Sequence, residues 1–184
     1  MIAGAIRGLV AVRGLAVVLL DGSRSLTGCY YRLREEPLPW TQVVGLQLSE
    51  WRSNVAGGAG SARNLIVETL VKGVPMAEFH ELRGDAANPT AVCTNYEELL
   101  GRRRPDLAVV AVGADGQIGT PPLSNEMSDL NGNTAGGRGS RLVTFCSESI
   151  GLRASALLGC TTVLAFGGCW PAEFDHPGLV HLEG

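Results

Sequence analysis

Two short polar motifs each follow an apolar run and carry groups that suit sugar or phosphate chemistry. The first, Asp21-Gly22-Ser23-Arg24, comes directly after the apolar run 15–20 and precedes a helical pattern. Backbone N–H groups at the start of a helix, together with a serine hydroxyl, suit an anion such as phosphate, and Arg24 would either add a further contact or crowd the pocket. The same residues also fit an ordinary strand-to-helix turn in which serine caps the helix. Both interpretations stay open.

The second motif occupies residues 113–119 and follows the apolar run 107–112. Asp115 supplies a carboxylate, although an aspartate before a glycine, here Gly116, is also a common turn pair. Gln117 can orient a hydroxyl group or a water molecule by hydrogen bonding, but it cannot carry a proton near neutral pH. A further carboxylate, Glu126, lies in the long polar stretch that follows and is a second candidate for this region.

The elements that would position these motifs alternate between short apolar runs and longer amphipathic segments. Strand-like runs alternating with helices predict an α/β fold with a mainly parallel sheet and helices on both faces. The carboxyl ends of the strands are where such folds bind ligands. The expected strands are 15–20, 43–48, 79–82, 107–112, 142–145 and 162–166, and the expected helices are 2–12, 26–34, 62–72, 88–100 and 148–156.

The length and composition limit the class of protein. The 184 residues are 45% hydrophobic and 18% charged, which is typical of one packed domain rather than a disordered chain. The net charge of −3 argues against nucleic acid as a partner. The apolar runs are too short to span a membrane, and five cysteines without a C-x-x-C pair indicate neither a disulfide framework nor a zinc site. We expect a cytoplasmic protein with a domain over residues 1–168 and an irregular tail over residues 169–184.

Read in order, several segments together resemble the glucosamine-6-phosphate deaminase/isomerase family, whose wider superfamily includes 6-phosphogluconolactonases. Residues 113–119, GADGQIG, resemble the family signature G-x-D-G-H-I-G/A, and residues 46–51, LQLSEW, resemble a strand that ends in Leu-Asp-Glu-Tyr or Leu-Asp-Glu-Trp. The further matching segments are 19–25 (LLDGSRS), 80–85 (HELRGD) and 140–144 (SRLVT). The resemblance covers roughly residues 3 to 168, and the chain resembles a divergent member that is shorter than the family at both ends.

The resemblance implies a three-layer α/β sandwich that needs neither a metal nor an organic cofactor. It also implies a sugar phosphate as ligand, which Gly22, Ser23 and Arg24 would hold. Asp115 would assist opening of the sugar ring. Glu126 would be the proton carrier if the chain has an insertion after Gly119 relative to the family, and without an insertion Pro122 would stand at that position. The backbone of the signature, Gly113 and Gly116 included, would complete the binding site.

Two departures from the family pattern affect the chemistry. Ser49 stands where the family has the aspartate that moves a proton between C1 and C2, and a serine hydroxyl cannot do this unaided near neutral pH. Gln117 stands where the family has a histidine. Glu50 follows Ser49, but neighbouring residues of a strand point to opposite faces, so we interpret Glu50 as structural or solvent-facing.

The first hypothesis is a divergent isomerase or deaminase of a hexosamine or hexose 6-phosphate. One alternative is hydrolysis of a lactone, as in the 6-phosphogluconolactonases. Another is a catalytically inactive domain that binds a sugar phosphate or a protein, which the loss of the aspartate and the histidine favours. Because shortness at both ends would leave parts of the sheet uncovered, we also expect a homo-oligomer.

Overall fold

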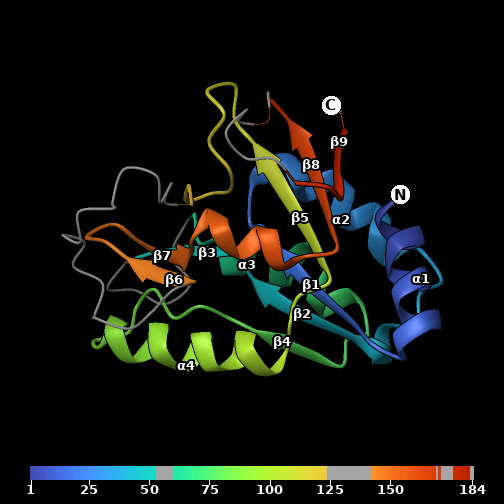
Figure 1. Cartoon of the computed structure of the whole chain (residues 1–184), viewed down its shortest axis with the longest axis horizontal. Coiled ribbons are helices and arrows are strands. Elements are labelled where there is room, and N and C mark those ends of the chain that lie inside the picture. The colour runs from blue at the N-terminus through green and yellow to red at the C-terminus, as the bar shows by residue number, and fades with distance from the viewer. Residues whose placement is uncertain (53–59, 124–141, 169, 171–175, 183–184) are drawn as a thin grey trace.

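The computed structural model describes residues 1–52, 60–123, 142–168, 170 and 176–182. Its main element is a six-stranded parallel sheet with the order β4-β2-β1-β5-β8-β9 (Figure 1). This confirms the α/β class expected from the sequence. The strands are β1 (Ala16–Leu20), β2 (Val43–Gln47), β4 (Glu78–His80), β5 (Leu107–Val112), β8 (Thr162–Gly167) and β9 (Leu179–Leu182).

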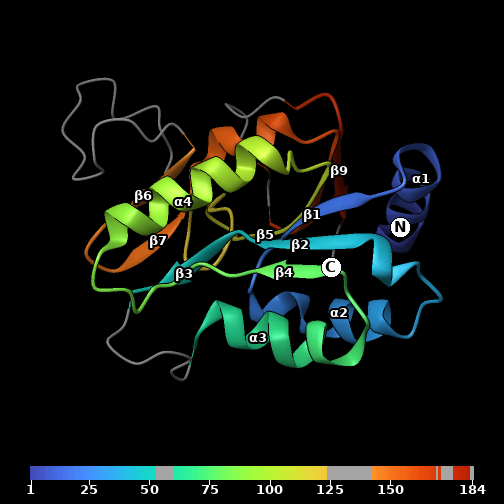
Figure 2. The same cartoon turned by 90° about the horizontal axis from the view of Figure 1, so that it is seen from below.

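Helices cover both faces of this sheet and give the three layers (Figure 2). One face packs against α1, α2 and α3, and the other packs against α4 and a 3-10 helix. Asn88 caps α4, since its side chain accepts a hydrogen bond from Ala91 N. The helices are α1 (Ile2–Arg13), α2 (Thr27–Arg34), α3 (Ala62–Thr69) and α4 (Pro89–Arg102), and the 3-10 helices are 24–26, 40–42, 71–73 and 154–159.

The three central strands owe their position to continuous apolar sequence. Every residue of β1, β2 and β5 is buried, as expected for parallel strands that are covered on both faces. Their alternate side chains divide between two clusters, one against α4 and one against α1 to α3. The apolar runs therefore predict these strands to within one residue at each end.

A second, antiparallel sheet of β3, β7 and β6 was not expected in this form. The predicted helix over 148–156 is wrong, because residues 149–152 form a strand and residues 154–159 form a 3-10 helix. Glycine at 151 allows this strand to pack against β3, because a Cβ atom there would lie 2.8 Å from Ser49 Cβ on the neighbouring strand. Side chains at 150 and 152 are buried, which is a strand period. The strands are β3 (Ser49–Trp51), β6 (Val143–Phe145) and β7 (Ser149–Leu152).

Part of the segment expected to be an irregular tail joins the main sheet. Residues 179–182 form β9, which pairs with β8 in parallel, so the word irregular is wrong for these four residues. Their sequence, LVHL, is short and follows a proline and a glycine, which concealed the strand. The division of the chain at residue 168 stays a prediction. Among the described residues, no helix is both long and apolar enough to cross a membrane.

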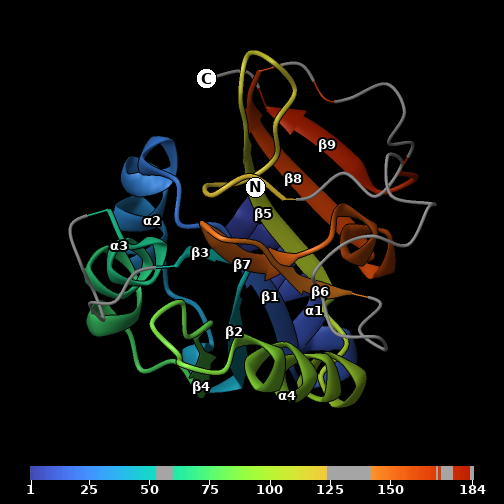
Figure 3. The same ribbon diagram turned by 90° about the vertical axis from the view of Figure 1, so that its left-hand side faces the viewer.

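The parallel arrangement brings the loops that follow β1 and β5 to one edge of the main sheet, and the second sheet lies beside them. Figure 3 looks onto the side of the molecule that carries both. The two motifs singled out in the sequence follow β1 and β5, which are direct neighbours. The fold therefore places them together.

Candidate functional site

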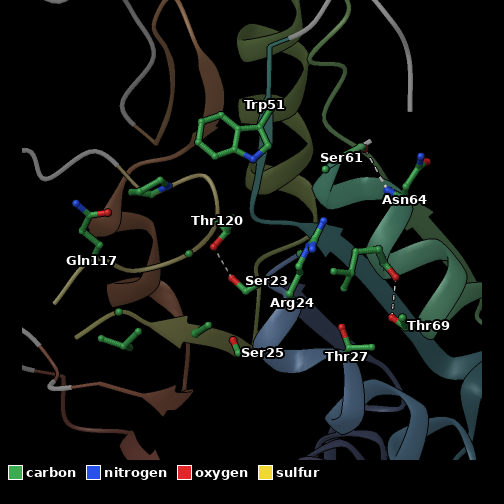
Figure 4. A pocket seen from close by; sticks show the side chains of 18 of the residues that line it. Ser23, Arg24, Ser25, Thr27, Trp51, Ser61, Asn64, Thr69, Gln117 and Thr120 are labelled. Atoms are coloured by element: carbon green, nitrogen blue, oxygen red, sulfur yellow. Dashed lines mark hydrogen bonds between the residues drawn. The ribbon is translucent and has the colours of Figure 1, made fainter. Parts of the chain in front are cut away.

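A cleft of about 1200 Å³ opens at this edge of the sheet (Figure 4). Its walls come from the loop after β1, the loop after β5, the end of β3 and one side of α3. Of the residues proposed from the sequence, the cleft is lined by Gly22, Ser23, Arg24, Gly113, Asp115 and Gln117. Further described residues of the lining carry hydroxyl, amide or indole groups, namely Ser25, Thr27, Trp51, Ser61, Asn64, Thr69 and Thr120.

The loop after β1 is held against the start of α3. A Cβ atom on Gly22 would lie 2.4 Å from Ala62 Cβ and 2.5 Å from its backbone atoms. Glycine at this position therefore lets the loop approach the helix, which is a packing requirement independent of any ligand. Ser61 caps the same helix by accepting a hydrogen bond from Asn64 N. The cleft is thus bounded by two elements in direct contact.

Asp21 lies at the end of β1 and beneath the floor of the cleft, with no exposed surface. Its carboxylate accepts hydrogen bonds from Ala111 N at 2.8 Å and from Thr120 N at 3.2 Å. The Ser23 hydroxyl is 2.9 and 2.8 Å from the two carboxylate oxygens, and 2.8 Å from Thr120 Oγ1. Asp21 therefore connects the loops after β1 and β5 and is joined to the cleft through Ser23. Tyr30 donates to its backbone carbonyl at 2.7 Å.

Burial changes the acidity of this carboxyl group. Loss of solvation raises the pKa of Asp21 to about 6, although the hydrogen bonds from Ala111, Ser23 and Thr120 act in the opposite direction. At neutral pH the group is mostly ionised, and it gains a proton slightly below neutrality. A titratable group near the working pH is a property shared by many functional sites.

From the sequence, Glu50 was interpreted as structural or solvent-facing, and the structure shows that it is structural and buried. It is 5% exposed and accepts hydrogen bonds from two backbone N–H groups at the start of α3, those of Ala62 at 3.0 Å and Arg63 at 2.8 Å. Ser61 Oγ, Trp51 N and Gln47 Nε2 are its other donors. A carboxylate at a helix N-terminus also interacts favourably with the helix dipole.

Two charged side chains of the cleft lining, Arg24 and Glu68, differ in their surroundings. Arg24 is exposed and extends into the cleft, between the Ser23–Thr120 pair and the helix that carries Asn64 (Figure 4). Glu68, on α3, is 2.5 Å from Lys72 in an ion pair. Among the described residues of the lining, Arg24 supplies the positive charge.

The loop after β5 forms a tight turn that presents Asp115 and Gln117 at the surface. Gly116 N donates to Gly113 O at 3.0 Å, and Gly113 N donates to Gln117 O at 2.8 Å. Asp115 Oδ1 accepts from Gln117 N at 3.1 Å, so the turn interpretation of this aspartate is correct. Gly119, at φ +83°, then directs the chain back to Thr120 over Asp21.

The comparisons with known proteins agree with the resemblance seen in the motifs. No profile of a known protein family matches the chain. A glucosamine-6-phosphate deaminase of Cellvibrio japonicus is 32% identical over 99 residues, 52% of this chain and 38% of the relative. A 6-phosphogluconolactonase of Pseudomonas putida is 31% identical over 117 residues, 62% of this chain and 48% of the relative. Each of the curated matches spans less than half of the relative's length.

The similarity of the fold extends over more of the chain than the similarity of the sequence. The crystal structure of a 6-phosphogluconolactonase from Thermotoga maritima superposes with a TM-score of 0.74 at 22% identity, covering 90% of this chain and 75% of that one. The chain is a divergent relative of these deaminases and lactonases. The three-layer fold that the resemblance implied is thereby confirmed.

Of the described residues that the resemblance singles out, only some line the cleft. Ser49, at the position of the family's aspartate, is 1% exposed, and its hydroxyl donates to Pro121 O at 2.9 Å. It lines a neighbouring cavity of about 350 Å³ instead of the cleft, and Pro122 lines both. Gly116 forms the turn and is not among the described lining residues. Glu126 lies outside the described residues.

Sequence reasoning missed the residues that hold the two loops together. Asp21 was interpreted as part of a turn, although a charged residue directly after a fully apolar strand marks the edge where α/β folds bind ligands. Thr120 follows the last glycine of the second motif and had no such signal. Asn64 and Thr69 come from the middle and end of a helix, and only the fold brings them to the cleft.

Proposed function

We propose that this chain binds a phosphorylated sugar or sugar acid in the cleft and acts on it. The observation that carries the proposal is the convergence of the loop 22–27, with its cation Arg24, and the loop 113–120 at the carboxyl ends of neighbouring strands. A guanidinium group suits a phosphate. The hydroxyl and amide groups of the lining suit a polyhydroxylated ligand, and the Trp51 indole supplies a flat apolar wall.

The reaction proposed first is isomerisation or deamination of a hexose or hexosamine 6-phosphate. In it Asp115 would assist ring opening at the mouth of the cleft, Gln117 would orient a hydroxyl group, and Glu126 would carry the proton. Ser49 would have no direct part, because its hydroxyl is buried and bonded to Pro121 O. Proton transfer between two carbon atoms therefore depends on a carboxylate elsewhere in the chain, since residue 49 is a serine.

Hydrolysis of a 6-phosphogluconolactone-type ester is the second candidate, and the position of Ser49 favours it. This reaction needs a proton taken from water and none taken from carbon. A third candidate, binding without turnover, follows from the same two replacements, since neither serine nor glutamine carries a proton near neutral pH.

Binding and turnover are measured separately to test the proposal. Titration calorimetry with 6-phosphogluconate and with glucosamine 6-phosphate reports binding, and release of ammonia or hydrolysis of the lactone reports turnover. Arg24→Met should weaken binding about tenfold, the loss of one charge-assisted contact, whereas Arg102→Met, an exposed control at the end of α4, should leave it unchanged. Absence of binding by the unaltered protein would contradict the proposal.

A single substitution then tests for turnover. Gln117→His places an imidazole at the cleft without altering the core, because Gln117 is exposed. Ser49→Asp is less suitable, since it would bury a carboxylate against the Pro121 carbonyl. Turnover gained by Gln117→His would favour an enzyme site that lacks its proton carrier. Binding without turnover in both proteins would favour the third candidate.

A further inference from the structure

Counting the available protons shows which group donates in each hydrogen bond among Thr120, Ser23 and Asp21. Ser23 and Thr120 each have one hydroxyl proton, and an ionised carboxylate has none. Ser23 Oγ is within 2.9 Å of both oxygens of Asp21, and Thr120 Oγ1 is 2.8 Å from Ser23 Oγ. A hydrogen bond to a charged acceptor is stronger than one to a neutral acceptor. The Ser23 proton is therefore directed to Asp21, and the Thr120 proton is directed to Ser23.

This chain of hydrogen bonds leaves acceptor lone pairs, and no donor, toward the cleft. An unprotonated phosphate oxygen is an acceptor only, so Ser23 cannot donate to it unless the serine releases Asp21. Release would leave an ionised, fully buried carboxylate with one donor fewer, which is costly. It would also place the phosphate close to the charge of Asp21. A ligand hydroxyl, in contrast, can donate to Ser23 Oγ and leave the chain intact.

On the basis of the proposed function, we propose that Ser23, held by Asp21 and Thr120, is a specificity residue that accepts a hydrogen bond from a hydroxyl group of the sugar, while the phosphate binds at Arg24. The serine of this loop was expected to hold phosphate together with Gly22 and Arg24. The buried carboxylate beside it reverses that role. The ligand is then oriented with its phosphate toward α3 and its hydroxyl-bearing carbons toward β5.

The charged and titratable groups around Asp21 are few in the described part of the chain. Tyr30, on α2, donates to the Asp21 carbonyl, and burial raises its pKa well above the ordinary value, so it stays neutral. Arg24 on the same loop and Asp115 on the loop after β5 line the cleft. Between about pH 5 and pH 7.5, Asp21 is the carboxyl group of this floor that changes its charge, because its pKa is about 6.

The pH dependence of binding distinguishes a ligand hydroxyl that donates to Ser23 from a phosphate that accepts from Ser23. A ligand hydroxyl donating to Ser23 stabilises ionised Asp21, so affinity due to Ser23 rises with pH. A phosphate accepting from Ser23 has the opposite effect, so that affinity falls with pH. Because phosphate also titrates in this range, the quantity to compare is the ratio of the Kd of Ser23→Ala to that of the unaltered protein, in which the ligand's own titration cancels.

The experiment measures this ratio by calorimetry for 6-phosphogluconate and for inorganic phosphate. For 6-phosphogluconate it should rise from about 1 at pH 5 to about 5 to 10 at pH 7.5, the value of one hydrogen bond. For inorganic phosphate it should stay near 1. Ser155→Ala, outside the cleft, is the matched control and should give a ratio near 1 for both.

A ratio that falls with pH, stays flat, or is as large for inorganic phosphate would overturn this inference and leave the proposed function standing. If the unaltered protein binds neither compound, both fall. Should Ser23→Ala fail to fold, an NMR titration of the Asp21 carboxyl group in the unaltered protein gives the answer. Its pKa should fall when 6-phosphogluconate binds, and a rise would overturn the inference.

Discussion

Asp21 directly follows β1, and Glu50 lies in β3, just beyond the end of β2; both are buried carboxylates, yet they are bonded in different ways. Five donors surround Glu50, and two of them are the backbone N–H groups that begin α3. Asp21 accepts hydrogen bonds from the backbone N–H groups of Ala111, Thr120 and Ser23 and from the Ser23 hydroxyl, which itself faces the cleft. Glu50 also accepts from a hydroxyl of the cleft lining, that of Ser61, but its backbone donors begin α3, whereas the hydrogen bonds of Asp21 join the two loops that form the cleft. We therefore expect Glu50 mainly to stabilise the fold and Asp21 also to respond to a ligand.

The comparison is tested most strongly by removing Glu50. Glu50→Ala leaves the N–H groups of Ala62 and Arg63 without their acceptor in a buried position, so we expect the free energy of unfolding to fall by about 4 kcal/mol. Glu68→Ala is the control, because Glu68 is exposed and its partner in the described part of the chain is Lys72; it should cost about 0.5 kcal/mol. Urea unfolding measures both. A loss below about 1 kcal/mol for Glu50→Ala would show that water replaces the carboxylate.

The contribution of Asp21 to the free energy of unfolding should depend on pH. Its pKa in the folded protein is about 6, above the ordinary 3.8, so the folded state favours the protonated form. This stabilisation is fully present below about pH 4 and is lost as pH rises through 6. Relative to Asp21→Asn, which does not titrate, the protein should lose up to about 3 kcal/mol of unfolding free energy between pH 4 and pH 7. Urea unfolding over this range measures the difference, and parallel curves would contradict the account.

Gly22→Ala tests the contact between the loop after β1 and the start of α3. A Cβ atom there would overlap the backbone of Ala62, which cannot move without disturbing the start of α3, so Gly22→Ala should cost about 2 kcal/mol. Gly8→Ala is the matched control in α1, where the Cβ meets no atom within 4 Å, and it should stabilise by about 0.5 kcal/mol. Equal shifts in thermal midpoint for the two variants would exclude the close approach.

The smallest effect is expected at Ser49. Ser49→Ala removes one buried hydrogen bond to Pro121 O, which we expect to cost about 1 kcal/mol in urea unfolding. Because Ser49 lines the neighbouring cavity and not the cleft, the affinity for 6-phosphogluconate should change less than about twofold, in contrast to Ser23→Ala. A larger loss of affinity, with unchanged stability, would place the ligand at Ser49.

The parts of the fold that the sequence predicts are those whose pattern is local. The continuous apolar runs of β1 and β5 and the capped start of α4 are correct to within a residue or two, since burial on both faces and a side-chain cap leave direct marks. Strand β6 was predicted to within one residue, whereas β7 was missed, because its close packing at Gly151 involves Ser49, about a hundred positions earlier in the chain.

The candidate site divides along the same line. Ser23, Arg24, Asp115 and Gln117 follow apolar strands, and the structure places all of them at the cleft. The importance of Asp21 depends on Thr120 and on the hydrogen bonds between the two loops, which have no pattern in the sequence. The expected metal-free and cofactor-free chemistry, the homo-oligomer and the cytoplasmic location stay predictions.

The central claim is that the cleft at the ends of β1 and β5 is where a sugar phosphate binds. The most direct measurement is the change in backbone amide NMR shifts when 6-phosphogluconate is added to the whole protein. We expect the largest changes at residues 22–27, 111–113 and 119–120, with small ones around Ser49 and residues 144–153. Shifts confined to the second group, or none at saturating ligand, would contradict the account.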